Sequence, residues 1–147
     1  MIESNGVGGT SSPEQLRQRT KVFALRIIEL FRDLPKTEEA RILGRQILRS
    51  GTSVAANYRS ACRSRSRADF ILKIGITVEE AHETAFWLEL LIDANIVKRD
   101  RLGHLLVEAN ELVRIFQASR TTARSHAEKS PIANHQSPIA EVMNGTN

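Results

Sequence analysis

The 147-residue sequence predicts an all-α fold, an antiparallel up-down-up-down four-helix bundle, and three observations support this prediction. Apolar residues recur every three or four positions along four stretches, which is the period of an amphipathic helix. Connections of only a few residues separate these stretches, and such connections make successive helices antiparallel neighbours. Only 5% of the residues are aromatic, with 8 Gly and 4 Pro, so the turn signals of a many-stranded β fold are scarce.

The first predicted helix begins at Pro13 and ends before Pro35. Ser12 can cap this helix, Pro13 suits the first helical position, and Gln15 completes a capping box. Apolar residues follow at heptad-like spacing, at Leu16, Phe23, Ile27, Leu30 and Leu34.

The second predicted helix begins near Thr37 and reaches about Ala61, with small residues from Ser50 to Ala56 in its middle. Gly51 there costs about 1 kcal/mol relative to alanine in a helix interior. Small side chains let another backbone approach closely. Two interpretations stay open from the sequence: tight packing inside one bundle, or a subunit contact or ligand pocket.

The third predicted helix starts at Ser66 and continues to Ile92, and the fourth starts at about Asp100. The bundle therefore occupies residues 13–120. We expect residues 1–12 and 121–147 to be disordered, because too little apolar surface is available there to offset the entropy of ordering. The residues predicted to line the core are Leu43, Ile47, Val54, Ile74, Ala81, Leu88, Leu105, Leu112 and Phe116.

Basic residues gather on one side of the second helix and in the turn after it. From Arg41 to Lys73 there are eight basic residues and one acidic residue, Asp69, a net charge of +7 in a chain that carries +4. At about 100° per residue, the five arginines of this helix lie within an arc of about 80°, opposite its apolar side. Arginine suits bidentate contact with phosphate, so these residues are the candidate nucleic-acid-binding site. This basic stripe comprises Arg41, Arg45, Arg49, Arg59, Arg63, Arg65, Arg67 and Lys73.

Other interpretations of the basic stripe remain. It can be a solvated helix face, or its arginines can pair with acidic residues of a neighbour. Tyr58, the aromatic residue nearest in sequence, lies on the core side, so the sequence predicts no platform on which bases could stack.

The third helix is apolar on two sides, because Leu72 lies among further apolar residues opposite the core positions. A helix that is apolar nearly all round is buried nearly all round, so we predict self-association. The alternative is that Trp87 and Leu90 cover the edge of a single bundle. The candidate interface residues are Ile76, Glu80, Glu83, Phe86, Trp87 and Leu90.

Catalytic motifs are few. Glu79 and His82 match one of the two Glu-x-x-His motifs that a di-iron bundle needs, and no second copy occurs. Cys62 has no histidine nearby in sequence, and the chain has no P-loop, Gly-rich dinucleotide turn or nucleophile elbow. We therefore expect no enzymatic activity, no metal and no cofactor.

Localisation follows from equally simple features. No stretch approaches the roughly 18 apolar residues of a membrane span, and the N-terminus lacks the pattern of a signal peptide. A single cysteine suits a reducing compartment. The prediction is a cytoplasmic protein that does not enter a membrane.

Three segments resemble the signature of the four-helix-bundle proteins of the 23S rRNA intervening-sequence family: residues 49–59 (RSGTSVAANYR), 66–71 (SRADFI) and 79–88 (EEAHETAFWL). The resemblance extends over roughly residues 22–118 and implies a bundle that assembles into a homopentameric ring. A related branch, the accessory proteins of diversity-generating retroelements, is a basic pentamer that binds nucleic acid and a reverse transcriptase. Ser60 stands where the family often has an acid, which makes this helix more basic.

The leading hypothesis is a non-enzymatic, homo-oligomeric bundle that binds RNA or DNA backbone through the basic stripe. The alternative is a protein-binding scaffold whose arginines pair with Glu79, Glu80 and Glu83 of a neighbouring subunit. Salt separates the two, because phosphate binding weakens steeply with salt whereas apolar contacts persist.

Overall fold

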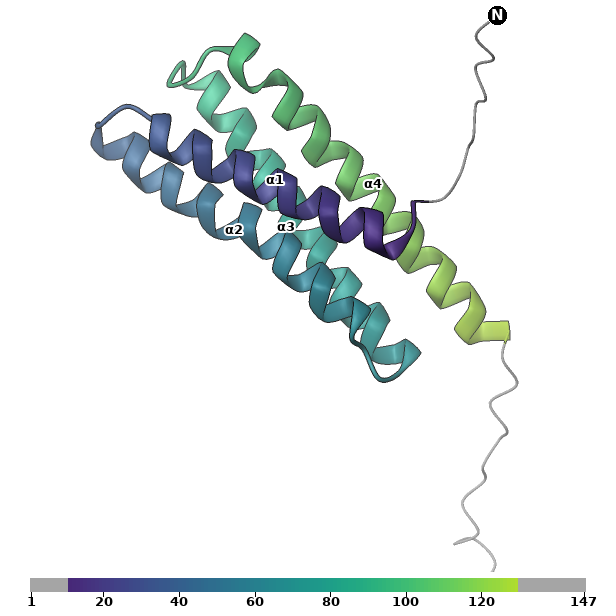
Figure 1. Cartoon of the computed structure of the whole chain (residues 1–147). Coiled ribbons are helices and arrows are strands. Elements are labelled where there is room, and N and C mark those ends of the chain that lie inside the picture. The colour runs from purple at the N-terminus through teal and green to yellow at the C-terminus, as the bar shows by residue number, and fades with distance from the viewer. Residues whose placement is uncertain (1–10, 130–147) are drawn as a thin grey trace, which may run out of the picture.

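The computed structural model describes residues 11–129, which form four helices and no strand: α1 (Pro13–Asp33), α2 (Glu38–Cys62), α3 (Arg67–Asp93) and α4 (Arg99–Lys129). They pack as an antiparallel bundle (Figure 1), which confirms the predicted fold class. Each helix packs closely on the one that follows it, whereas α1 approaches α4 less closely than it approaches α2. Within the described range, no helix is both long enough and apolar enough to span a membrane.

The first three helices begin at the residues that the sequence marks as caps. The Gln15 N–H donates to Ser12 Oγ at 3.2 Å, and the Ser12 N–H donates to Gln15 Oε1 at 2.9 Å, which completes the capping box. Thr37 and Ser66 accept hydrogen bonds in the same way at the starts of α2 and α3. Local hydrogen-bonding chemistry therefore sets these three boundaries.

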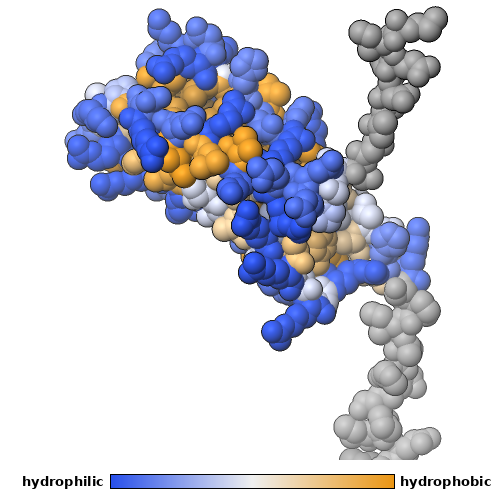
Figure 2. Space-filling view, in the orientation of Figure 1, coloured by the Kyte–Doolittle hydropathy of each residue, from blue (hydrophilic) through white to orange (hydrophobic). Residues whose placement is uncertain are grey.

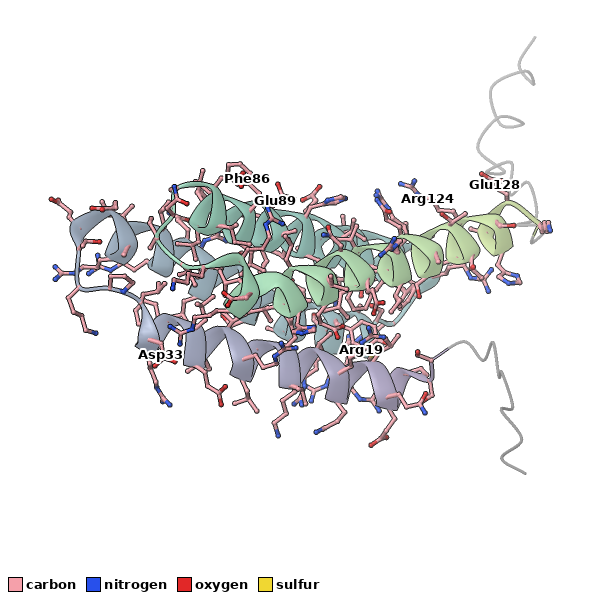
Figure 3. All side chains as sticks on the ribbon, turned by 90° about the horizontal axis from the view of Figure 1, so that it is seen from above. Arg19, Asp33, Phe86, Glu89, Arg124 and Glu128 are labelled. Atoms are coloured by element: carbon pink, nitrogen blue, oxygen red, sulfur yellow. The ribbon has the colours of Figure 1, made fainter. Side chains whose placement is uncertain are left out.

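The fourth helix is longer than the sequence predicted, so the expectation of disorder from residue 121 was wrong for residues 121–129. Phe116 is the last buried residue of α4, and the helix continues past the core, where Figure 3 shows Arg124 and Glu128 on the projecting end. Alanine, arginine, glutamate and lysine dominate this end and favour helix without burial. The predicted disorder of residues 1–10 and 130–147 lies outside the described residues.

One contiguous core runs through the bundle. All of the predicted core residues are buried except Leu43, which is half-buried and packs against the core from its edge. The buried rings of Tyr58 and Phe116 pack against each other toward one end of the core, with centroids 5.0 Å apart. Beside Leu43, Gly44 is buried and lies against Leu34, the residue directly after α1.

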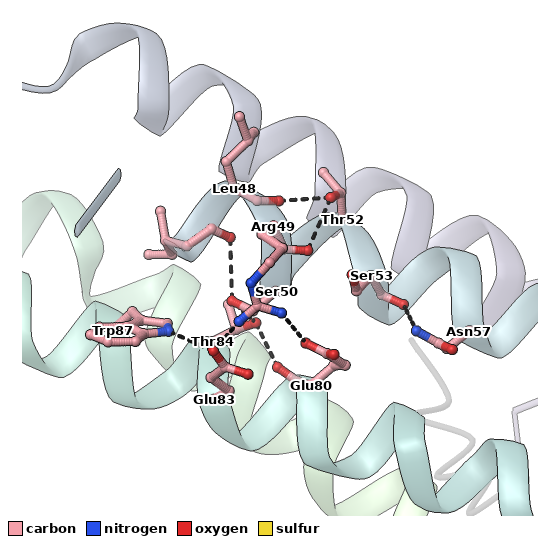
Figure 4. A network of polar contacts seen from close by, with 11 residues as sticks. Leu48, Arg49, Ser50, Thr52, Ser53, Asn57, Glu80, Glu83, Thr84 and Trp87 are labelled. Carbon is pink, nitrogen blue, oxygen red and sulfur yellow. Dashed lines mark hydrogen bonds and ion pairs between the residues drawn. The ribbon is translucent and has the colours of Figure 1, made fainter. Parts of the chain in front are cut away.

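The small residues of α2 serve packing inside the chain. A Cβ atom on Gly51 would lie 2.8 Å from Ile27 Cγ1 of α1, closer than real contacts permit. On the neighbouring side, the Thr84 hydroxyl of α3 donates to Ser50 Oγ at 3.0 Å (Figure 4). Of the two interpretations left open by the sequence, close packing within one bundle is the one that applies at these two residues.

We expect Gly51→Val to lower the free energy of unfolding by about 1–3 kcal/mol, because the larger side chain overpacks the contact with Ile27. Chemical denaturation followed by circular dichroism measures the change. The control is Gly103→Ala on α4, where a Cβ meets nothing within 4 Å and helix propensity favours alanine by about 1 kcal/mol. Equal effects of the two substitutions would contradict the proposed contact.

Ion pairs connect α1 to α4. Arg19 Nε lies 2.7 Å from Glu108 Oε1, and the same guanidinium also pairs with Glu111. Burial lowers the pKa of Arg19, but the two carboxylates outweigh this effect and the net shift is upward. Charge thus supplements apolar packing where α1 and α4 face each other (Figure 3).

Candidate nucleic-acid interface

The arginines of α2 form two pairs on the same side of the helix. One pair is Arg41 and Arg45, the other is Arg59 and Arg63, and all four side chains are exposed. Each residue of the second pair lies 18 residues after its counterpart in the first. Eighteen residues are about five helical turns, so the two pairs share one direction around the axis and lie about 27 Å apart along it. The predicted face of α2 therefore exists as a surface with a basic pair toward each end.

Between the two pairs, Arg49 is held by acidic residues of α3. Its guanidinium pairs with Glu83 and lies 3.4 Å from Glu80 Oε2, and Trp87 Nε1 donates to Glu83 at 3.1 Å (Figure 4). Burial, together with the nearby carboxylates of Glu83 and Glu79, raises the pKa of Glu80 despite the opposing effect of Arg49. Arg49 is thus the stripe residue with two carboxylate partners in its own chain.

Lys73 is also paired. Its Nζ lies 3.0 Å from Asp69 Oδ2, one helical turn away, and this contact holds the pKa of Asp69 below its ordinary value. The remaining six residues of the stripe make no ion pair with any described residue. We call these the free arginines: Arg41, Arg45, Arg59, Arg63, Arg65 and Arg67.

Helix α1 adds an arginine that the sequence analysis missed. Arg17 lines a cavity of about 340 Å³ together with Arg59 and Arg63, and Glu14 lies 3.2 Å from its guanidinium. The nearby Cys62 and Glu14 raise the pKa of Arg17. Arg17 is distant in sequence, but an antiparallel α1 necessarily brings its N-terminal end beside the C-terminal end of α2.

The far end of the stripe lies in the connection between α2 and α3. Arg65 and Arg67 are exposed there, and they line a shallow depression with Phe70 and with Ala123 of α4. Four free arginines are therefore at this end of the bundle, and the other two, Arg41 and Arg45, lie near the connection between α1 and α2.

The predicted interface residues of α3 fall into three groups. Phe86 is 52% exposed and points away from the bundle (Figure 3), and Ile76 is 37% exposed. Trp87 and Leu90 are half-buried, and Trp87 packs against the core, as expected of a residue that covers the bundle edge. Glu80 and Glu83 hold Arg49, as described above.

Four apolar residues, Leu72, Ile76, Phe86 and Leu90, nevertheless share one row along α3. Positions in this row recur at intervals of four and three residues, and Glu79 and Glu83 occupy its middle. Leu72, at one end of the row, is 65% exposed. Elsewhere, apolar patches also interrupt the hydrophilic surface on the face drawn in Figure 2.

Neither Glu79 nor His82 belongs to a metal-binding cluster. In residues 11–129, no group of three or more His, Cys, Asp or Glu side chains is arranged to hold a metal ion. His82 Nε2 lies 3.4 Å from the side-chain nitrogen of Gln117.

Comparisons with known proteins agree with the fold. The sequence model of the 23S rRNA-intervening sequence protein family matches residues 14–118. The chain is also similar to a solved Bacteroides thetaiotaomicron structure, described as a protein with unknown function from the S23 ribosomal protein family, with 35% identity and a TM-score of 0.69. That match covers 74% of this chain and 97% of the other. No curated protein sequence matches, and neither description states a catalytic activity.

Proposed function

This chain belongs to the 23S rRNA-intervening sequence protein family, and we propose that it is a non-enzymatic, homo-oligomeric protein that binds the backbone of RNA or DNA through its free arginines. The observation that carries the proposal is the absence of carboxylate partners for these six exposed arginines among the described residues. An unpaired guanidinium can form two parallel hydrogen bonds to a phosphate without first giving up an ion pair.

Self-association forms the second part of the proposal. The exposed row on α3 that includes Leu72, Ile76 and Phe86 supports it, because apolar patches rimmed by polar residues often mark protein–protein contacts. The family resemblance favours a homopentamer. A ring would repeat the free arginines around its circumference and raise the number of phosphates contacted at once.

The alternative, a protein-binding scaffold joined by basic and acidic faces, finds less support. It required Glu79, Glu80 and Glu83 to pair with arginines of a neighbouring subunit. Glu80 and Glu83 already pair with Arg49 of the same chain.

We expect the double variant Arg59→Ala/Arg63→Ala to bind generic RNA and DNA more weakly, because two phosphate contacts are lost. The slope of log affinity against log salt concentration should fall by about two, or about one per contact. Fluorescence anisotropy at several salt concentrations measures this slope, and light scattering checks that the oligomer is intact.

The matched control is Arg114→Ala, an exposed arginine of α4 outside the basic stripe. It should leave both the affinity and the salt slope close to those of the unmodified protein. If Arg59→Ala/Arg63→Ala behaves like this control while the oligomer stays intact, the free arginines do not bind phosphate.

A further inference from the structure

A cavity of about 430 Å³ lies where the connection between α1 and α2 meets the first turns of α2. Its size is within the range of small-ligand sites. The floor is apolar and is formed by Phe31, Leu34, Pro35 and Ala40. Two free arginines, Arg41 and Arg45, therefore stand beside an apolar surface that comes mostly from the preceding helix and its connection.

Gly44 allows this floor to form. A Cβ atom at this position would lie 2.7 Å from Leu34 Cδ1 and 3.2 Å from Phe31 Cδ2. Both side chains can therefore pack down on the backbone of α2, and Phe31 remains half-buried at the cavity. The structure thus brings an aromatic ring to the basic stripe, which the sequence did not predict.

The rim of the cavity is entirely basic. Arg32 and Lys36 join Arg41 and Arg45 there, and no acidic side chain is among the lining residues. None of the four makes an ion pair with a described residue. An occupant that suits this lining is anionic and has a flat apolar part.

A second cavity of the bundle has a lining of mixed charge. It lies between α1 and the start of α4, with a volume of about 470 Å³. Arg26 and Arg101 line it together with Glu29 and Asp33, so its charges are mixed and select no anion. The cavity at the α1–α2 connection differs from this one because its charged lining residues are all basic.

We propose that the cavity at the α1–α2 connection binds an unpaired nucleotide of single-stranded nucleic acid, with the base on Phe31 and the adjoining apolar floor and the phosphate on Arg41 and Arg45. This inference rests on the proposed function and adds base contact to backbone contact. Single-strand binding proteins combine the same two elements, a positively charged groove and an aromatic ring on which a base stacks. A paired base in a duplex has no free face to offer, so the cavity distinguishes single strands from duplexes.

The test compares the full-length protein with Phe31→Leu, which keeps an apolar side chain but removes the aromatic ring. The probes are a labelled single-stranded oligonucleotide and the same sequence as a duplex, with affinity measured by fluorescence anisotropy. We expect Phe31→Leu to weaken single-strand binding about fivefold or more and to leave duplex binding unchanged. Replacing the bases of the single strand by abasic sites should weaken binding to the unmodified protein by a similar factor.

Two controls make the result specific. Leu25→Ala changes an exposed apolar residue of α1 outside both the cavity and the row on α3, and it should alter neither affinity. Circular dichroism shows whether Phe31→Leu keeps the helical content of the parent protein. Gly44→Ala provides an independent variant, because its Cβ displaces Leu34 and Phe31 from the floor and should weaken single-strand binding selectively.

Several outcomes would overturn the inference. Unchanged single-strand binding by Phe31→Leu, with weaker binding by Arg59→Ala/Arg63→Ala, would reject the base contact and leave the proposed function standing. Equal losses for single strand and duplex would also reject it. If the unmodified protein bound neither probe, both proposals would fail. If it instead bound vesicles of an anionic phospholipid through Phe31, the cavity would belong to a lipid anion.

Discussion

Phe116→Ala is expected to lower the free energy of unfolding by about 3–5 kcal/mol. Phe116 is fully buried and packs against the ring of Tyr58, so truncation leaves a cavity between α2 and α4 in addition to the lost apolar burial. Leu112→Ala, one helical turn earlier, should cost about 2–5 kcal/mol for the same reason. Urea denaturation at a fixed protein concentration measures both values, because the proposed association would also contribute to stability.

The control for these core substitutions is Val107→Ala on the same helix. Val107 is more than half exposed, so its truncation should change the free energy of unfolding by about 0.5 kcal/mol or less. A loss of that small size for Phe116→Ala would mean that the ring does not contribute to the core as described.

The second large effect concerns assembly. We expect Leu72→Glu/Phe86→Glu to dissociate the proposed oligomer into folded monomers, because two charges would be transferred from water into the proposed contact. These two residues test the interface better than Trp87, which packs against the core and would also disturb the fold. Light scattering gives the mass, and circular dichroism shows whether the helices remain.

The matched control places the same charges on α1, at Val22→Glu/Leu25→Glu. Both residues are about half exposed and lie outside the row on α3, so the mass of the oligomer should not change. An unmodified protein that is monomeric at tens of micromolar would contradict the assembly, as would an unchanged mass for Leu72→Glu/Phe86→Glu.

The sequence predicted most of the fold because the signals at its helix starts are local. Ser12, Thr37 and Ser66 each cap a helix through a neighbour three residues later, which requires no tertiary information. The sequence did not predict the end of α4, because its residues offer little apolar surface for burial. The last turns of this helix depend on helix propensity alone. The burial of Gly44 in place of Leu43 has another cause. A glycine appears as a weak point in a helix, but here Leu34 and Phe31 pack directly against the backbone of α2.

The basic stripe was predictable as a surface but not as a set of binding groups. Arg45 and Arg49 are one turn apart on the same face, and only the positions of Glu80 and Glu83 on α3 distinguish the free residue from the paired one. Periodicity on one helix carries no information about acidic residues on another. The contribution of Phe31 was hidden for the same reason, since it belongs to the helix before the stripe.

The ion pairs of Arg19 also bear on how the bundle opens and closes. The extensive contacts all join helices that are consecutive in the chain, so contact order is low and folding should be fast, in microseconds to milliseconds. Salt screens the exposed part of the link from α1 to α4, while α3 stays packed between two helices. In native-state hydrogen exchange, the amides of α1 should therefore exchange through a partial opening of the bundle, and this exchange should be faster at high salt. The amides of α3 should exchange most slowly. Because Arg17 and Phe31 both belong to α1, each such opening also takes apart the two cavities that the free arginines of α2 share with it.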